Sequence, residues 1–249
     1  MMPRNARKTS KTGIYHIITR GINRQDIFQE QEDKRVYIDR LCKYKKECSF
    51  EVYAYCLMGN HVHLLLKEGD VCVSEVMKRI GASYVYWYNK KYDRVGHLFQ
   101  DRFKSETVEN DAQLLATTRY IHQNPKKAGL KIGDWTSYPD YINGGGMTDI
   151  GLVMGILGDG KEDQKAAFIT YMNETDANKC MEHENQKRLT DKEAKKRIIE
   201  IGHVQHCQEL QSYKKQDRDR VIQKLKSEGF SIRQLERITG INRGVIQKA

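Results

Sequence analysis

The chain has 249 residues, and 43 Lys and Arg against 33 Asp and Glu give it a formal net charge of +10. No apolar run approaches the roughly 18 residues that span a bilayer, so we do not expect an integral membrane protein. A hydrophobic content of 39% is enough for a core, which excludes wholesale disorder. The basic N-terminus has no apolar segment and is not expected to be a secretory signal. Six cysteines without a C-x-x-C pair indicate reduced thiols in a cytosol.

Charge divides the chain into three parts. Residues 1–140 hold 24 basic against 17 acidic residues, residues 141–186 hold 3 against 8, and residues 187–249 hold 16 against 8. Two basic blocks therefore flank an acidic connector, and we expect three regions with these boundaries. Such blocks favour a long polyanion such as nucleic acid as the partner, although solvated basic helices would give the same balance.

The first region alternates strands and helices, and a glycine-asparagine pair predicts a hairpin between two of the strands. Ser74 is expected to cap the second helix, and Asn110 or Asp111 the third. Because Pro125 discourages continuation, the third helix is expected to end at Asn124. The predicted elements are, in order, a strand at 13–21, a helix at 33–49, strands at 50–58 and 61–67, a helix at 74–92, a strand at 102–108 and a helix up to 124.

This order predicts an α+β fold of the split βαβ, or ferredoxin-like, kind, with a mainly antiparallel sheet and helices on one face. Three glycines, Gly144 to Gly146, then break the chain. The acidic stretch that follows, to about Glu184, is expected to form weakly packed helices. From Lys187 onwards we expect an all-helical, basic region.

Two histidines stand two residues apart on the predicted strand 61–67. His61 and His63 share a face because side chains alternate along a strand, whereas Val62 points into a core. Two imidazoles on one face suit a divalent metal ion. The alternative is an ordinary pair of half-exposed strand histidines.

Tyr120 and Asn124 lie four residues apart on the predicted third helix and therefore share a face. The carbonyl oxygen of Asn124 could complete a metal site begun by the two histidines, with the phenol of Tyr120 beside it. In such a site the metal polarises a phosphate oxygen while the phenolate attacks phosphorus. The alternative is a tyrosine of an amphipathic helix and an asparagine that caps the helix end.

Four blocks, in this order, resemble the single-tyrosine HUH transposases (IS200-like), and most closely the branch of REP-associated tyrosine transposases. The resemblance covers about residues 10–140. The blocks are RGINR at 20–24, MGNHVHLL at 58–65, GHLFQDR at 96–102 and YIHQNPKKAGL at 120–130.

The resemblance implies that His61 and His63 are metal ligands, with Mg²⁺ or Mn²⁺ as the cofactor. It places Asn124 at the position of the family's third, amide ligand, where other members can have glutamine. It implies that Tyr120 forms a 5′-phosphotyrosine link to single-stranded DNA and leaves a free 3′-hydroxyl. With one catalytic tyrosine, the link must be resolved by another DNA end, which favours strand transfer over nicking.

We therefore expect a transposase that cleaves and rejoins single-stranded DNA beside palindromic hairpins, as in repetitive extragenic palindromes (REP). Residues 1–140 are the expected catalytic domain, and the expected location is cytoplasmic and nucleoid-associated. The alternatives are a non-catalytic hairpin-binding regulator that keeps the fold, or a replication- or relaxase-type nickase. Insertion-sequence relatives form dimers, whereas the REP-associated branch tends to be monomeric with a longer tail, so the tail favours a monomer.

Several polar residues near these blocks are candidate DNA contacts. Arg20, Asn23 and Arg24 follow the first strand and could reach a backbone phosphate or a folded-out base. Arg102 and Lys104 alternate on one face of the last strand and could do the same. The alternative for each cation is an ordinary surface charge.

Other aromatic residues of the first region receive no catalytic role. Tyr84, Trp87 and Tyr88 share one helical face, which favours a place in the core over base stacking. His16 and His122 are close to the motifs, but His122 lies two residues from Tyr120 and on a different helical face.

The C-terminal end resembles a helix-turn-helix. A basic helix at 219–229 ends at a glycine, a serine-capped helix spans 231–240, and a turn at Gly240 precedes a last helix at 241–248. In this arrangement Asn242, Arg243 and Gln247 face a major groove. The alternative is a plain helical bundle.

Overall fold

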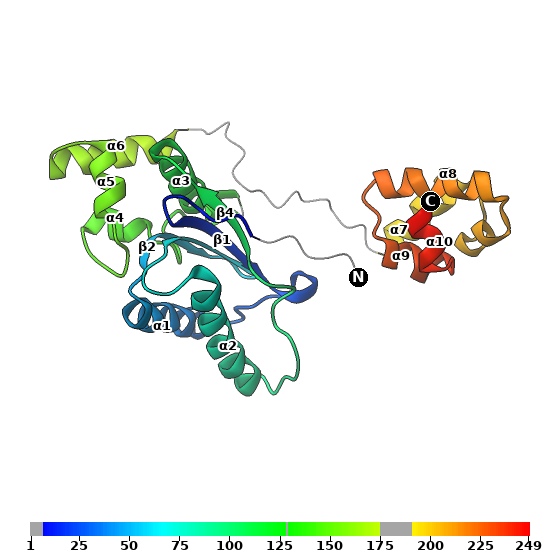
Figure 1. Cartoon of the computed structure of the whole chain (residues 1–249), viewed down its shortest axis with the longest axis horizontal. Coiled ribbons are helices and arrows are strands. Elements are labelled where there is room, and N and C mark those ends of the chain that lie inside the picture. The colour runs from blue at the N-terminus through cyan, green and yellow to red at the C-terminus, as the bar shows by residue number, and fades with distance from the viewer. Residues whose placement is uncertain (1–6, 128, 175–190) are drawn as a thin grey trace. The chain divides into compact units, whose positions relative to one another are not determined.

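The structure, a computed structural model, describes residues 7–127, 129–174 and 191–249. The chain forms two compact units, residues 1–181 and 182–249, which we treat separately (Figure 1). Among the residues that the structure describes, no helix combines the length and the hydropathy needed to cross a membrane.

Four antiparallel strands form the sheet of the first unit, in the order β2-β3-β1-β4. The central β1 (Ile14–Arg20) pairs with β3 (His61–Lys67) on one side and with β4 (Lys104–Val108) on the other. β2 (Glu51–Leu57) completes the hairpin with β3. This strand order and pairing confirm the predicted α+β, ferredoxin-like plan.

Helices cover both faces of the sheet, whereas the sequence predicted them on one. α1 (Gln31–Cys48) and α2 (Val73–Lys91) pack on the face that carries Ile17. α3 (Asp111–Lys127) packs on the opposite face, against β2 and β3, in the core that contains Leu65. The prediction of helices on one face is right for the two helices of the ferredoxin-like plan. The additional third helix follows the last strand and takes the opposite face, which is the one still open.

The first turns of α2 and α3 are stabilised in different ways. Asn110 caps α3 as predicted, since its Oδ1 accepts a hydrogen bond from the amide of Gln113 at 2.9 Å. Ser74 does not cap α2. The helix begins one residue earlier, at Val73, whose amide donates to the carboxylate of Glu68 at 2.6 Å. A carboxylate from the preceding loop thus takes the capping role expected of the serine.

α3 continues beyond Asn124, so the prediction that Pro125 ends it is wrong. A proline in a helix removes one amide donor and crowds the preceding turn. Here only two helical residues follow, and the carbonyl of Pro125 accepts a hydrogen bond from the amide of Leu130 at 2.9 Å. The cost is therefore confined to the last turn.

Residues 141–174 are packed into the first unit, and the prediction of weakly packed helices is wrong. They contribute the second half of α4 (Tyr138–Asn143), all of α5 (Gly151–Leu157) and all of α6 (Lys161–Asn173). Phe168 is fully buried, and its ring stacks on that of Tyr141 with centroids 4.4 Å apart. Acidic residues outnumber basic ones in this segment, but a few large apolar residues fix its packing.

The end of α6 is fastened to α3 by two side chains that flank Tyr120. Arg119 of α3 contacts the carboxylate of Glu174 at 2.7 Å and donates to the carbonyl of Tyr171 at 3.3 Å. Gln123 donates to the carbonyls of Met172 and Glu174 at 2.8 and 3.0 Å. The last carbonyls of α6 are therefore satisfied by the neighbouring helix.

The second unit is helical over its described residues, as predicted. Its helices surround a core of apolar side chains that includes Ile198, Leu210 and Ile246. The elements are α7 (Asp191–Gly202), a short 3₁₀ helix η2 (Cys207–Ser212), α8 (Lys215–Ser227), α9 (Ile232–Thr239) and α10 (Arg243–Lys248).

Candidate functional site

β1 and β3 bring three histidines together on the sheet face that α3 covers. Their antiparallel register sets Arg20 opposite His61 and Ile18 opposite His63, and alternation puts His16 on the same face as Ile18. The ring centroids of His61 and His63 are 5.0 Å apart, and those of His16 and His63 are 5.3 Å apart. His61 is partly exposed, whereas His63 and His16 are buried, so the cluster extends from the surface into the interior.

α3 presents Tyr120 to this cluster. The ring of Tyr120 lies edge-on to His63 and His16, with centroids 5.6 and 5.7 Å away. The structure thus brings together three residues that the sequence predicted from separate motifs, namely His61, His63 and Tyr120. Asn124 is buried one turn further along α3, and its Nδ2 donates to the backbone carbonyl of Tyr120 at 3.2 Å. Its side-chain carbonyl oxygen is then the atom that could act as a ligand.

The histidine pair fits a divalent metal ion. Nδ1 of His61 lies 2.6 Å from Oδ1 of Asn60, and Nδ1 of His63 lies 3.0 Å from Nε2 of His16. With Nδ1 of both rings engaged in this way, each ring would bind a metal through Nε2. Metal-binding histidines usually donate from the other ring nitrogen to an acceptor, which fixes the tautomer and the ring orientation.

Arg20 lies next to the histidine cluster at the end of β1. Burial and the neighbouring Arg24 lower the pKa of Arg20, whereas Tyr120 raises it. The guanidinium and the phenol are therefore within electrostatic reach, and a guanidinium in this position stabilises a phenolate or a phosphate. Burial also lowers the pKa of His16, against the opposite influence of Glu106.

The three candidate DNA contacts Arg20, Asn23 and Arg24 lie at the end of β1 and in the loop that follows it. The last two are exposed and both have positive φ angles, 51° and 61°. The side chain of Asn60 donates to the carbonyl of Arg24 at 3.2 Å. Because Asn60 also contacts His61, the loop is tied to the turn that holds the histidine pair.

Arg102 and Lys104 are both exposed, but they do not share a strand. β4 begins at Lys104, which pairs with Ile18 on the histidine face of the sheet. Arg102 lies in the bend before the strand, so the prediction that the two alternate along one strand is wrong. Ile18 is the last residue of β1 that pairs with β4. The segment before β4 returns to the end of β1 through the bridge between Gly21 and Phe99, and the amide of Gln100 donates to the carbonyl of Arg20 at 2.9 Å.

His16 is the site residue that the sequence analysis left without a role. The signal that could have found it is alternation, because His16, Ile18 and Arg20 share one face of a strand. His122 is buried like His16, but it does not lie in the histidine cluster. Its Nε2 lies 2.7 Å from Oγ of Ser137, and burial lowers its pKa to about 3.

The aromatic run of α2 belongs to the core, as predicted. Tyr84 and Tyr88 are buried, and Trp87 is partly buried against the same cluster. The hydroxyl of Tyr84 donates to the carbonyl of Ile27 at 2.5 Å. Tyr86, in contrast, is 74% exposed.

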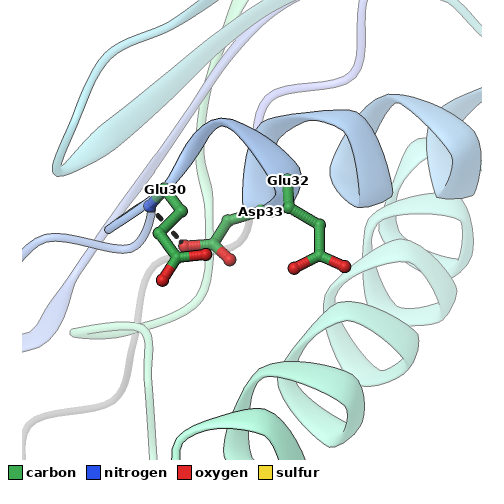
Figure 2. A group of neighbouring side chains, drawn as sticks. All are labelled: Glu30, Glu32 and Asp33. Atoms are coloured by element: carbon green, nitrogen blue, oxygen red, sulfur yellow. Dashed lines mark hydrogen bonds between the residues drawn. The ribbon is translucent and has the colours of Figure 1, made fainter.

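A separate group of acidic side chains, Glu30, Glu32 and Asp33, lies at the start of α1 (Figure 2). The ammonium of Lys91 contacts all three carboxylates, at 3.0, 2.7 and 2.7 Å. Burial acts to raise the pKa of Asp33, but hydrogen bonds from Lys91, the Glu30 amide and other donors outweigh it and lower the pKa. The group therefore holds a lysine and caps a helix, and we assign it no metal.

The second unit places Asn242, Arg243 and Gln247 on its surface. Gly240, with φ of 72°, makes the turn between α9 and α10, a conformation that favours glycine. Oδ1 of Asn242 accepts a hydrogen bond from the amide of Gly244 at 2.8 Å. Asn242 is thus the N-cap of α10, a structural role that the sequence analysis missed.

Residues 9–124 match the family model of IS200-like transposases. This part of the chain, which contains the histidine cluster and Tyr120, therefore belongs to the IS200-like transposase family, a class of DNA-cleaving enzymes. The function of the class is DNA transposition.

Two solved structures are similar to the chain. A REP-associated tyrosine transposase bound to a REP hairpin is 20% identical, with a TM-score of 0.47 over 60% of this chain and 90% of its own. A candidate transposase from Deinococcus radiodurans R1 is 18% identical, with a TM-score of 0.33 over 48% of this chain and 95% of its own. No curated protein matches the chain. The family assignment rests on residues 9–124, because both structural similarities are low.

Proposed function

We propose that this transposase cleaves and rejoins single-stranded DNA through a covalent link between Tyr120 and a 5′-phosphate. The observation that carries the proposal is the position of the Tyr120 ring, edge-on to His63 at 5.6 Å and on the sheet face that also carries His61. A candidate nucleophile and two candidate metal ligands therefore lie in one cluster, which supports the proposal.

In the cleavage step the hydroxyl oxygen of Tyr120 loses its proton to solvent and bonds to phosphorus. The bond from phosphorus to O3′ breaks, and O3′ takes up a proton to leave a 3′-hydroxyl. The other fragment stays attached as a 5′-phosphotyrosine. Attack by a second 3′-hydroxyl reverses these changes, so a single tyrosine supports strand transfer.

A metal site at His61 and His63, with Asn124 as a third ligand, accompanies this chemistry. When bound there, Mg²⁺ or Mn²⁺ polarises a phosphate oxygen and offsets the charge that develops on it. An ordinary phenol has a pKa near 10, so a tyrosine needs such help at neutral pH. Arg20 is suited to neutralise the same phosphate from the end of β1.

We infer that the substrate is single-stranded DNA beside a REP-like hairpin, and that the protein works as a monomer in the cytoplasm, on the nucleoid. The hairpin class follows from the four sequence blocks. Arg24, Arg102 and Lys104 would contact the backbone near the site, and Arg243 and Gln247 would contact duplex DNA from the helix-turn-helix-like end.

The decisive test is incubation of labelled hairpin DNA and Mg²⁺ or Mn²⁺ with the wild type and Tyr120→Phe, followed by a denaturing gel. The wild type should form a covalent adduct and Tyr120→Phe none. Tyr86→Phe, which alters an exposed tyrosine of α2, is the control and should retain the adduct. An adduct with Tyr120→Phe would refute the proposal. Hairpin binding without any wild-type adduct would favour the regulator, and nicking without rejoining the nickase.

The role of the second unit is tested by a chain that ends after residue 181. Residues 187–249 carry 16 basic against 8 acidic residues, and their loss should weaken hairpin binding and reduce its salt dependence. Titrations of hairpin DNA over a range of salt concentrations measure both effects. Unchanged affinity and salt slope would show that this unit does not contact the DNA.

A further inference from the structure

His16 forms a buried contact with a predicted metal ligand. It is fully buried, and its Nε2 lies 3.0 Å from Nδ1 of His63. The two ring planes are within 20° of each other, with centroids 5.3 Å apart. The centroid separation is close to the N···N distance plus two ring radii of about 1.1 Å each. The two nitrogens therefore lie near the line that joins the ring centres, which is the alignment that a hydrogen bond requires.

Glu106 lies behind His16. It is the residue of β4 that pairs with His16 in the sheet, and its carboxylate is 3.8 Å from Nδ1 of His16. A neutral imidazole carries one N–H, and a carboxylate on the Nδ1 side favours the hydrogen there. Nε2 of His16 is then an acceptor, and His63 must donate to it from Nδ1.

His61 also has an acceptor beside its Nδ1, in this case the side-chain oxygen of Asn60. Its Nδ1 lies 2.6 Å from the side-chain oxygen of Asn60, and a carbonyl oxygen only accepts. His61 therefore also carries its hydrogen on Nδ1. Both histidines would present an unprotonated Nε2, the form that binds a metal.

We propose that His16, supported by Glu106, is a positioning residue that holds His63 as the Nδ1–H tautomer and so presents its Nε2 as a metal ligand. The proposal deepens the metal site of the proposed function and rests on it. His16 itself contacts neither the metal nor the DNA.

The first test measures the tautomer of His63 in metal-free wild-type protein by long-range ¹H–¹⁵N NMR. We expect hydrogen on Nδ1 and none on Nε2. Hydrogen on Nε2 would overturn the proposal, as would a His63 that binds metal through Nδ1 beside a ligating His16. Because no metal is present, this result is independent of whether the site binds one.

The second test measures Mn²⁺ binding by electron paramagnetic resonance. His16→Phe keeps a ring of similar shape but has no acceptor, and should weaken binding by about 10- to 100-fold. His16→Gln, whose carbonyl oxygen can accept from His63, should restore most of the affinity. His122→Phe changes another fully buried histidine and should leave Mn²⁺ binding unchanged.

Wild-type affinity in folded His16→Phe, or no rescue by His16→Gln, would overturn the proposal. If His16→Phe does not fold, the comparison of His16→Gln with wild type and the tautomer measurement decide the question. Failure of the metal site itself is recognised separately, because His61→Ala with His63→Ala would then leave Mn²⁺ binding unchanged.

Discussion

The two faces of the sheet in the first unit bury different kinds of side chain. Towards α1 and α2, Ile17 packs with Tyr84 and Tyr88 in a core of apolar and aromatic side chains. Towards α3, apolar residues are interrupted by His16 and His63, which are buried and bonded to each other. Burial of polar groups costs free energy unless they are paired, so the first face contributes mainly to stability, whereas the second carries the paired polar groups that the proposed chemistry would use.

The sharpest contrast between the faces is a pair of tyrosines. Tyr120→Phe should abolish the covalent adduct and leave the free energy of unfolding nearly unchanged. Tyr84→Phe should do the opposite, lowering that free energy by about 1 kcal/mol through loss of the bond to Ile27, with cleavage within a few-fold of wild type. Adduct gels and urea unfolding of both variants measure the two effects. Loss of the adduct in both variants would mean that stability and catalysis are not separated between the two faces.

The histidine pair should separate catalysis from binding. His61→Ala together with His63→Ala should abolish cleavage but leave hairpin binding largely intact, because most affinity comes from phosphate contacts. Cleavage assays and hairpin titrations, with and without a chelator, measure this. Full cleavage by the double variant in chelator would refute the metal assignment.

The α3 face also depends on residues after 140. Phe168→Ala should lower the free energy of unfolding by about 3–5 kcal/mol, and a chain that ends at residue 140 should be destabilised further. Leu152→Ala, on a partly exposed residue of α5, is the control and should change stability little. Urea unfolding monitored by circular dichroism measures these differences. A stable chain of 140 residues would show that α5 and α6 are dispensable.

The smallest expected effect is the contribution of His122 to the pH dependence of the free energy of unfolding. Its pKa is lowered by burial to about 3, whereas an unfolded histidine titrates near 6.5. Between these values only the unfolded state binds the proton, so the free energy of unfolding falls as pH falls through this window, by up to about 1.4 kcal/mol per pH unit. His122→Gln should reduce this dependence, as urea unfolding at neutral pH and near pH 4.5 would show. An unchanged slope would place the acid sensitivity elsewhere.

Local patterns predicted much of this unit. Alternation and a hairpin turn defined β3 with His61 and His63, and the spacing of four residues placed Tyr120 and Asn124 on one helical face. The role of His16 could not be read in this way, because it depends on the pairing of β1 with β3, two segments almost fifty residues apart in the chain. The packing of Phe168 was missed for the same reason, since its ring partners His122 and Tyr141 lie on other elements.

The contacts between α6 and α3 have a mechanical consequence. Glu174 directly follows α6 and is held by Arg119 and Gln123, and these two side chains flank Tyr120 on the same helix. A displacement of the end of α6 is therefore transmitted first to α3. Tyr120, the proposed nucleophile, and the two side chains that hold the end of α6 lie on one helix, so a movement of α6 acts on the tyrosine without passing through the sheet.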